Sequence, residues 1–320
     1  MMKFLICGVG SIGERHIMNL LTLGYDDIIL YRTRSRPFRM IDREFPTYST
    51  LDKALAQQPD VALICNPTHL HMETAIQCAK ANCHLFIEKP VSSSTDCHHQ
   101  LQRLVDDNNT VAMVGYMMRY HPCVLKIKKM IEDDLIGDVV SLRATWGEYL
   151  PNWHPWEDYR LSYSAQRRMG GGPALTLSHE LDLALWLFGN VKKVMGLPNY
   201  NSNLELDTEH GIDILILFEN GVTANIHLDY LQKPPVHNTE IVGNNGRIYF
   251  DYFNNKVELY THQNKSKNES FVSQDFDRND MFVSELKDFI TAVNHKKPSP
   301  IPLKDAYLSV DVALRALNQF

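Results

Sequence analysis

The stretch Lys3-Phe4-Leu5-Ile6-Cys7-Gly8-Val9-Gly10-Ser11-Ile12-Gly13 decides the fold of this chain. Residues 4–7 form an apolar run typical of a buried strand, and apolar residues recur at helical spacing from Ile12 until Gly24. Three glycines between a strand and a helix allow a tight turn, a close approach of a pyrophosphate, and close contact between helix and strand. The free N–H groups at the helix start then face the anion. We predict a dinucleotide-binding turn with contacts from Gly8, Gly10, Ser11, Ile12 and Gly13. The alternative is an ordinary glycine-bearing strand–helix turn.

The end of the second expected strand indicates which dinucleotide binds. In NAD-binding proteins an acidic residue about twenty residues after the glycines holds the ribose 2′-hydroxyl. Here the strand 28–31 is followed by Arg32-Thr33-Arg34-Ser35-Arg36, and the acids Asp26 and Asp27 lie at its other end. Because cations and hydroxyls suit a 2′-phosphate, we predict NADP rather than NAD, with contacts from Arg32, Thr33 and Arg34. The alternative is a solvated basic loop whose arginines stack on the adenine.

Length and composition restrict the class of protein. A chain of 320 residues with 44% hydrophobic and 22% charged residues is globular and long enough for two domains. The net charge of −6 does not favour nucleic-acid binding, because a phosphate backbone requires a basic surface. No apolar stretch approaches the length of a membrane span, and no signal-peptide pattern precedes residue 3. We expect a cytoplasmic protein with a small-molecule substrate and without a nucleic-acid or membrane partner.

The cysteines and histidines do not predict a metal site. All six cysteines lie in the first half of the chain, without the paired spacing of a zinc site or the framework of a secreted protein. We expect them to be buried thiols. The clusters His69-Leu70-His71 and Cys97-His98-His99 have no second ligand group at a suitable spacing, so we expect no bound metal.

Strand and helix signals alternate up to about residue 120 and then change. The alternation predicts an α/β domain of the Rossmann type, a doubly wound parallel sheet with helices on both faces. From residue 139 onward strands predominate, and Glu219-Asn220-Gly221 predicts a hairpin turn. We predict a C-terminal α+β domain with a largely antiparallel open sheet, of which one face is polar or covered by another subunit. The expected divisions are residues 1–120, residues 121–302, and a C-terminal helix at 303–320 that packs on the first domain.

A set of motifs follows in a fixed order along the chain. The motifs are Cys7-Gly8-Val9-Gly10-Ser11-Ile12-Gly13, Asn66-Pro67-Thr68-His69-Leu70-His71, Glu88-Lys89-Pro90, Gly115-Tyr116 with Arg119-Tyr120-His121-Pro122, and Gly170-Gly171-Gly172 leading to His179-Glu180-Leu181-Asp182. Together they resemble the glucose-fructose oxidoreductase, inositol dehydrogenase and MocA family over essentially the whole chain. The resemblance implies reversible oxidation of a secondary alcohol on a sugar, polyol or related compound, and a homo-dimer or homo-tetramer. It also implies dinucleotide contacts from Asn66, Pro67, His69, His71, Glu88 and Lys89.

Lys89 and His179 are the candidate catalytic residues. Hydride transfer from a carbinol carbon requires that the hydroxyl proton leaves too, and a free alcohol is a very weak acid at neutral pH. Lys89 follows a strand at the sheet edge where such folds bind ligands, and its ammonium group can stabilise a developing alkoxide. His179 is the candidate general base, because imidazole accepts and returns protons near pH 7. Considered alone, Lys89 would be a surface lysine and His179 a core histidine. The leading prediction is an NAD(P)-dependent dehydrogenase or reductase acting on CH–OH groups.

The residues before His179 depart from the family pattern. The family commonly carries an aspartate three or four positions before this histidine, where this chain has Thr176 and Leu175. Either Thr176 and water replace the carboxylate, Glu180 or Asp182 serves instead, or the alcohol-oxidising reaction has been lost. The last option keeps open a dinucleotide-binding sensor or regulator without turnover. A reductase of a non-sugar substrate, such as an imine, is a further alternative.

Two segments supply the predicted substrate contacts. Residues 153–160 form an aromatic and charged loop suited to closing over a sugar, with packing or an interface as the alternative. Residues 119–121 follow the fifth buried strand, and an arginine there favours an anionic group on the substrate. The predicted contacts are Arg119, Tyr120, His121, Tyr159, Arg160, Tyr163 and Thr176.

Overall fold

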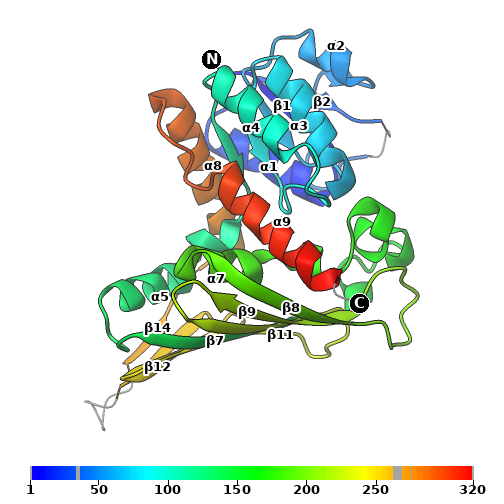
Figure 1. The fold of residues 1–320 in the computed structure, drawn as a ribbon. Coiled ribbons are helices and arrows are strands. Elements are labelled where there is room, and N and C mark those ends of the chain that lie inside the picture. Colours follow the sequence, from blue (N-terminus) through cyan, green and yellow to red (C-terminus); the bar gives the residue numbers. More distant parts are fainter. Residues whose placement is uncertain (1, 34–36, 262–268, 275, 319–320) are drawn as a thin grey trace. The chain divides into compact units, whose positions relative to one another are not determined.

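The computed structural model describes residues 2–33, 37–261, 269–274 and 276–318 (Figure 1). The chain divides into two units, and each contains one sheet. The first unit consists of residues 1–116 and 279–307, and the second consists of residues 117–278 and 308–320.

A six-stranded parallel sheet forms the centre of the first unit. Its strand order is β3-β2-β1-β4-β5-β6. The strands are β1 (Phe4–Cys7), β2 (Ile28–Tyr31), β3 (Thr47–Tyr48), β4 (Val61–Ile64), β5 (His84–Ile87) and β6 (Ala112–Val114). All residues of β1 and β4 are buried, as expected where helices cover both faces. The predicted Rossmann sheet is confirmed. Its switch point, where ligands bind beyond the strand ends, lies between the neighbouring strands β1 and β4.

The helices of the first unit include two, α2 and α8, that were not predicted from the sequence. They are α1 (Ser11–Thr22), α2 (Leu51–Leu55), α3 (His71–Lys80), α4 (His98–Asp107) and, apart from its first residue, α8 (Arg278–His295). Helix α8 belongs here because Phe282 packs edge-on against His16 of α1, and Phe289 packs edge-on against Phe86 of β5. This division differs from the expected one, in which residues 121–302 form a single domain. Helix α9 (Leu303–Leu317) also differs, since it continues into the second unit from residue 308.

The cysteines are free thiols, and five of the six are buried. Cys97 is the exception to the expected burial. It precedes α4 with a left-handed backbone (φ +63°) in an irregular segment at the surface.

The second unit is built on an eight-stranded sheet in the order β14-β13-β12-β11-β7-β10-β9-β8. The strands are β7 (Val139–Gly147), β8 (Val191–Asn199), β9 (Gly211–Phe218), β10 (Thr223–Asp229), β11 (Val236–Gly243), β12 (Gly246–Asp251), β13 (Lys256–Thr261) and β14 (Glu269–Val272). Strands β7 and β10 pair in parallel, and the other described pairs are antiparallel, which confirms the predicted sheet type. The predicted hairpin joins β9 to β10, and Gly221 adopts the positive φ (+89°) that this turn requires.

Helices cover one face of this sheet. The helices α5 (Pro122–Glu132), α6 (Pro173–Thr176) and α7 (His179–Phe188) contact β7, β9, β10 and β13 (Figure 1). The end of α9 lies against β8, since a Cβ on Gly196 would collide with the carbonyl oxygen of Ala316. The opposite face exposes apolar side chains of β8 and β9, namely Met195, Leu197 and Leu215. Among the described residues, no helix combines the length and the apolar character that crossing a membrane would require.

Candidate functional site

The glycine turn between β1 and α1 fits a pyrophosphate. Gly8 has φ +93°, and a Cβ there would lie 2.6 Å from Cα of Asn66, which follows β4. A Cβ on Gly13 would collide with the carbonyl oxygen of Gly8. By contrast, a Cβ on Gly10 would meet no protein atom within 4 Å, and Gly10 gives α1 no side-chain cap. The turn therefore leaves open space at an uncapped helix start, where an anion is stabilised by backbone N–H groups.

Gly10→Ala should separate cofactor binding from folding. Gly10 has φ −90°, which alanine adopts readily, and its added methyl group meets no protein atom. We expect an unchanged melting temperature and a dissociation constant for reduced dinucleotide at least about tenfold higher, because the methyl group occupies the space of the pyrophosphate. Fluorescence titration measures the affinity and circular dichroism the melting temperature. Unchanged affinity would remove this turn from the binding site.

Strand ends β4 and β5 bring several predicted cofactor contacts to one edge of the sheet. His71, which is buried, lies with Nε2 2.7 Å from the carbonyl oxygen of Asn66 and Nδ1 2.9 Å from that of Pro90. Burial lowers the pKa of His71, and its contacts with these two carbonyl oxygens partly oppose that shift. His71 thus holds the segments after β4 and β5 together, beside Pro67 and Lys89. His69 is exposed in the turn before α3.

The side chain of Glu88 points away from solvent and into the first unit. It accepts a hydrogen bond from His16 Nε2 at 2.7 Å, and its second oxygen accepts one from the backbone N–H of Lys89 at 3.3 Å. The sequence analysis did not identify His16. The available signal was its position on the buried stripe of α1 that also contains Gly13, Ile17 and Leu20.

The segment after β2 contains the residues predicted to select the dinucleotide. Arg32 lies with its guanidinium 5.1 Å from the ring centre of Phe38, and Thr33 is exposed. Arg34 lies outside the described residues. No acidic residue immediately follows β2.

His179 begins helix α7 in the second unit and is buried. Its ring stacks on Trp146 of β7, with ring centres 5.7 Å apart, and Trp146 stacks in turn on His237 of β11 at 4.4 Å. His237 Nε2 lies 2.7 Å from a carboxylate oxygen of Glu180. The neighbour of His179 in sequence therefore has its own buried histidine partner.

Asp182 pairs with Arg119 inside the second unit. Two parallel hydrogen bonds join them, from Nε to Oδ2 at 2.9 Å and from Nη2 to Oδ1 at 2.7 Å, and their side chains are 0% and 5% exposed, respectively. The sequence analysis offered Asp182 as an orienter of His179 and Arg119 as a partner for a substrate anion. In the structure each of these two charges meets the other, because a buried charge requires a close counter-charge.

Thr176 occupies the region where the family pattern has a carboxylate. Its hydroxyl donates to the carbonyl oxygen of Gly172 at 2.7 Å and accepts from the Tyr230 hydroxyl at 2.7 Å. Glu209, which the sequence analysis missed, accepts from the N–H of Ala174 at 3.0 Å, and burial raises the pKa of Glu209 to about 7. Its sequence signal is weak, since it is one acid in the run 205–209.

The other predicted substrate contacts lie in two segments of the second unit, residues 120–121 before α5 and residues 159–163. His121 is fully buried, accepts from the N–H of Cys123 at the start of α5, and has its pKa lowered to about 4 by burial. Tyr120 is half-buried beside it. Arg160 is exposed and pairs with Asp158 at 2.8 Å. Half-buried neighbours of Arg160 are Tyr159 and Tyr163.

The strand order and the glycine turn define a dinucleotide-binding Rossmann fold. Comparison with known families agrees. The description "Oxidoreductase family, NAD-binding Rossmann fold" matches residues 2–116, and "GFO/IDH/MocA C-terminal domain" matches residues 124–249. The chain belongs to the GFO/IDH/MocA oxidoreductase family, as its motifs predicted.

Relatives of known name are similar to this chain to different extents. Myo-inositol 2-dehydrogenase of Thermotoga maritima is 26% identical over 97% of this chain and 93% of its own length. Levoglucosan dehydrogenase of Pseudarthrobacter phenanthrenivorans is 34% identical, but the match spans 46% of this chain and 38% of that protein. A solved structure of levoglucosan dehydrogenase in complex with NADH and levoglucosan has a TM-score of 0.86, covers 99% of this chain and 96% of its own, and is 19% identical. That structure shows the same fold.

Proposed function

We propose that the protein is an NAD(P)-dependent dehydrogenase or reductase that transfers a hydride between nicotinamide and a CH–OH or ketone group of a sugar, polyol or sugar derivative. The observation that carries the proposal is the carboxyl edge of the first sheet, where open space at Gly10 and an uncapped helix start lie at the same sheet edge as the end of β5, which Lys89 follows. Membership of an NAD-binding oxidoreductase family supports the cofactor, and the names of the relatives support the substrate class.

The proposed chemistry assigns one role to each of two side chains. When bound, the nicotinamide supplies or accepts the hydride. Lys89 is assigned to the substrate oxygen, where its ammonium group stabilises developing negative charge. His179 is assigned to the hydroxyl proton as general base, and it returns that proton in the reverse direction. Stacking on Trp146 fixes the ring of His179, and the Thr176–Tyr230 hydrogen bond fixes the segment before it.

NADP is the proposed preference, with NAD(H) as the established family cofactor. The support is the sequence after β2, which supplies Arg32 and Thr33 and no acid for a ribose 2′-hydroxyl. Further assigned cofactor contacts are Gly8, Gly10, Ser11, Ile12, Gly13, Arg34, Asn66, Pro67, His69, His71, Glu88 and Lys89. Assigned substrate contacts are Tyr120, His121, Tyr159, Arg160, Tyr163 and Thr176, whereas the predicted contact Arg119 has its charge compensated by Asp182.

We further propose that the protein is a homo-oligomer in the cytoplasm. The uncovered face of the second sheet exposes Leu197 at 60%, beside Met195 and Leu215, and exposed apolar patches of this kind mark interfaces. The six free cysteines are typical of a reducing compartment.

Fluorescence of the reduced cofactors tests the proposed function. We expect NADPH to bind roughly tenfold more tightly than NADH, because the guanidinium of Arg32 can pair with the 2′-phosphate. With oxidised cofactor present, sugars, polyols and sugar acids are then added one at a time, and appearance of reduced-cofactor fluorescence measures turnover. Cofactor binding without turnover on any compound in either direction would favour a regulator. Tighter binding of NADH would overturn the NADP assignment alone.

A further inference from the structure

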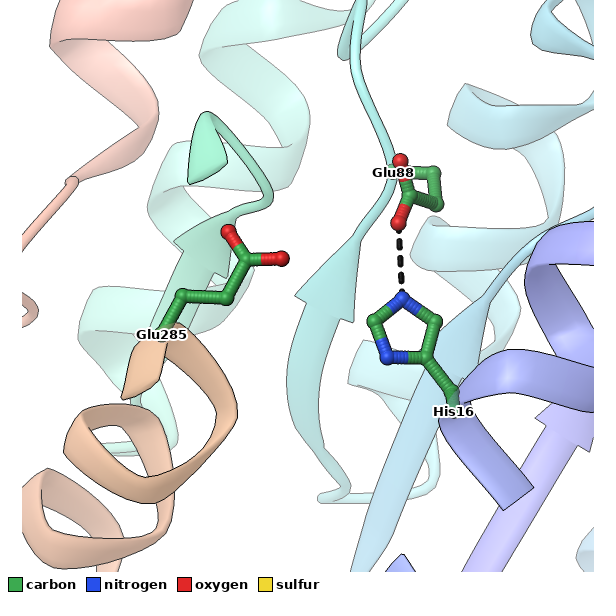
Figure 2. A group of neighbouring side chains, drawn as sticks. All are labelled: His16, Glu88 and Glu285. Atoms are coloured by element: carbon green, nitrogen blue, oxygen red, sulfur yellow. Dashed lines mark hydrogen bonds and ion pairs between the residues drawn. The ribbon is translucent and has the colours of Figure 1, made fainter. Parts of the chain in front are cut away.

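Three titratable side chains form a buried cluster in the first unit (Figure 2). His16 comes from α1, Glu88 follows β5, and Glu285 comes from α8. Their exposed fractions are 0%, 7% and 0%, respectively. One nitrogen or oxygen atom from each lies within 4.8 Å of the others, and Figure 2 shows the Glu285 carboxyl group facing the His16–Glu88 hydrogen bond.

Glu285 has no direct polar partner among the described residues. Neither of its carboxyl oxygens makes a hydrogen bond there, although both are buried. Aromatic rings surround the cluster, because Phe86 lies edge-on to His16 at 5.1 Å and Phe282 at 6.3 Å. An ionised carboxylate in such surroundings costs several kcal/mol unless a positive charge compensates it.

Among the described residues, the two side chains that form the cluster with Glu285 supply no spare positive charge. The His16–Glu88 pair is neutral if the imidazole is protonated and negative if it is not. Cys65, which follows β4, is the other titratable group at the cluster, and burial raises the pKa of its thiol, which keeps it neutral. Burial likewise raises the pKa of the Glu285 carboxyl well above its usual range, and the nearby Glu88 carboxylate raises it further.

We propose that Glu285 is a protonated carboxylic acid that hydrogen-bonds to the His16–Glu88 pair through one bridging water and so positions the Glu88-Lys89-Pro90 turn. The carboxyl oxygens of Glu285 make no direct hydrogen bond to the pair but one lies within 4.8 Å of it, a range that two hydrogen bonds through one water, roughly 4.5 Å, can span. The link to the turn is direct, since Glu88 accepts from the N–H of Lys89. Gly115 also lies close to the Glu88 carboxyl group, because a Cβ on Gly115 would be 3.4 Å from Glu88 Oε1.

The same three side chains could in principle ligate a divalent cation. The proton is favoured because His16 Nε2 and Glu88 Oε1 lie 2.7 Å apart, the length of a charge-assisted hydrogen bond, so each atom already has its partner. A metal would have to replace that bond. The metal content of the purified full chain and of its Glu285 variants distinguishes the two cases.

Glu285→Gln and Glu285→Leu form a matched pair of variants. Glutamine keeps a neutral hydrogen-bonding group, whereas leucine keeps the volume and removes the hydrogen bond. The expected kinetic results rest on the proposed function. Glu285→Gln should retain kcat within about twofold of the parent value. We expect Glu285→Leu to lower kcat by about tenfold or more, with a less than about threefold change in the dissociation constant for reduced cofactor, because the turn is displaced while the binding site persists. Equal loss in both variants would overturn the positioning role.

Two readouts test the proton independently of any activity. Infrared spectroscopy should show the band of a protonated carboxylic acid that is absent from Glu285→Gln. Because the folded-state pKa is raised, the stability that the proton provides is present below about pH 4.5 and is lost as the pH rises through the folded-state value. The melting temperature of the parent relative to Glu285→Gln should therefore fall steadily as the pH rises above about 4.5, the ordinary pKa of the carboxyl group.

The outcomes separate the possible failures. The proposal that Glu285 is protonated would be overturned if the infrared band were missing and the difference in melting temperature between the parent and Glu285→Gln did not change with pH. A stoichiometric metal in the purified protein, lost in Glu285→Gln, would replace the proton with a cation site. If no substrate is turned over but the infrared band and the pH-dependent melting temperature are both observed, the proposed function is wrong and the protonation of Glu285 is still supported.

Discussion

Lys89→Ala should lower turnover by about a hundredfold or more while leaving the affinity for reduced cofactor nearly unchanged. Removing one preorganised donor to a developing oxyanion costs about 2.7 to 4 kcal/mol of transition-state stabilisation. Lys89 follows β5 at the carboxyl edge of the sheet, where the cofactor is held mainly by the glycine turn after β1. Loss of the ammonium group should therefore appear in kcat rather than in cofactor binding. Steady-state kinetics and fluorescence titration measure the two quantities separately.

Lys80→Ala is the matched control for this variant. Lys80 is an exposed lysine at the end of α3 in the same unit, so its removal changes the net charge equally without reaching the strand ends. We expect kcat of Lys80→Ala to equal that of the parent. If Lys89→Ala also turns over at the parent rate, Lys89 does not take part in the reaction.

The parallel sheet could be predicted because its strands carry their signal locally. Strands β1 and β4 are buried on both faces and read as short continuous apolar runs between helical segments. The second sheet was predicted only in part. In β8 the exposed positions carry Met195 and Leu197 while Gly196 is buried, and in β11 the buried positions include His237 and Thr239, so neither sequence alternates apolar and polar residues as a half-buried strand does. Their pairing with β9 and β7 depends on contacts between distant segments.

The candidate site shows the same limit. Motifs predicted Lys89 and His179, but the partners of the neighbouring charged groups could not be predicted. Glu285 lies nearly two hundred residues after Glu88, and only the fold brings them together. One signal was available, because Glu285 interrupts the buried stripe of α8 formed by Met281, Phe282, Leu286 and Phe289. A carboxylate on such a stripe indicates a buried partner or a bound proton.

The Arg119–Asp182 pair should show strong energetic coupling in the second unit. Removing one partner of a buried ion pair costs about 3 to 5 kcal/mol, because the remaining charge is left without compensation. We expect Arg119→Met and Asp182→Leu each to lower the free energy of unfolding by that amount. Replacing both residues together should cost less than either single change, since no charge then remains buried.

Tryptophan fluorescence measures this effect in the relevant unit. All four tryptophans, at positions 146, 153, 156 and 186, lie in the second unit, and Arg119 lies 5.4 Å from the ring centre of Trp186. Urea titrations of the parent, the two single variants and the double variant complete the cycle. If the two single costs simply add in the double variant, the pair does not stabilise the start of α7. Coupling of the expected sign would show instead that Asp182, through its pair with Arg119, anchors the helix that carries His179.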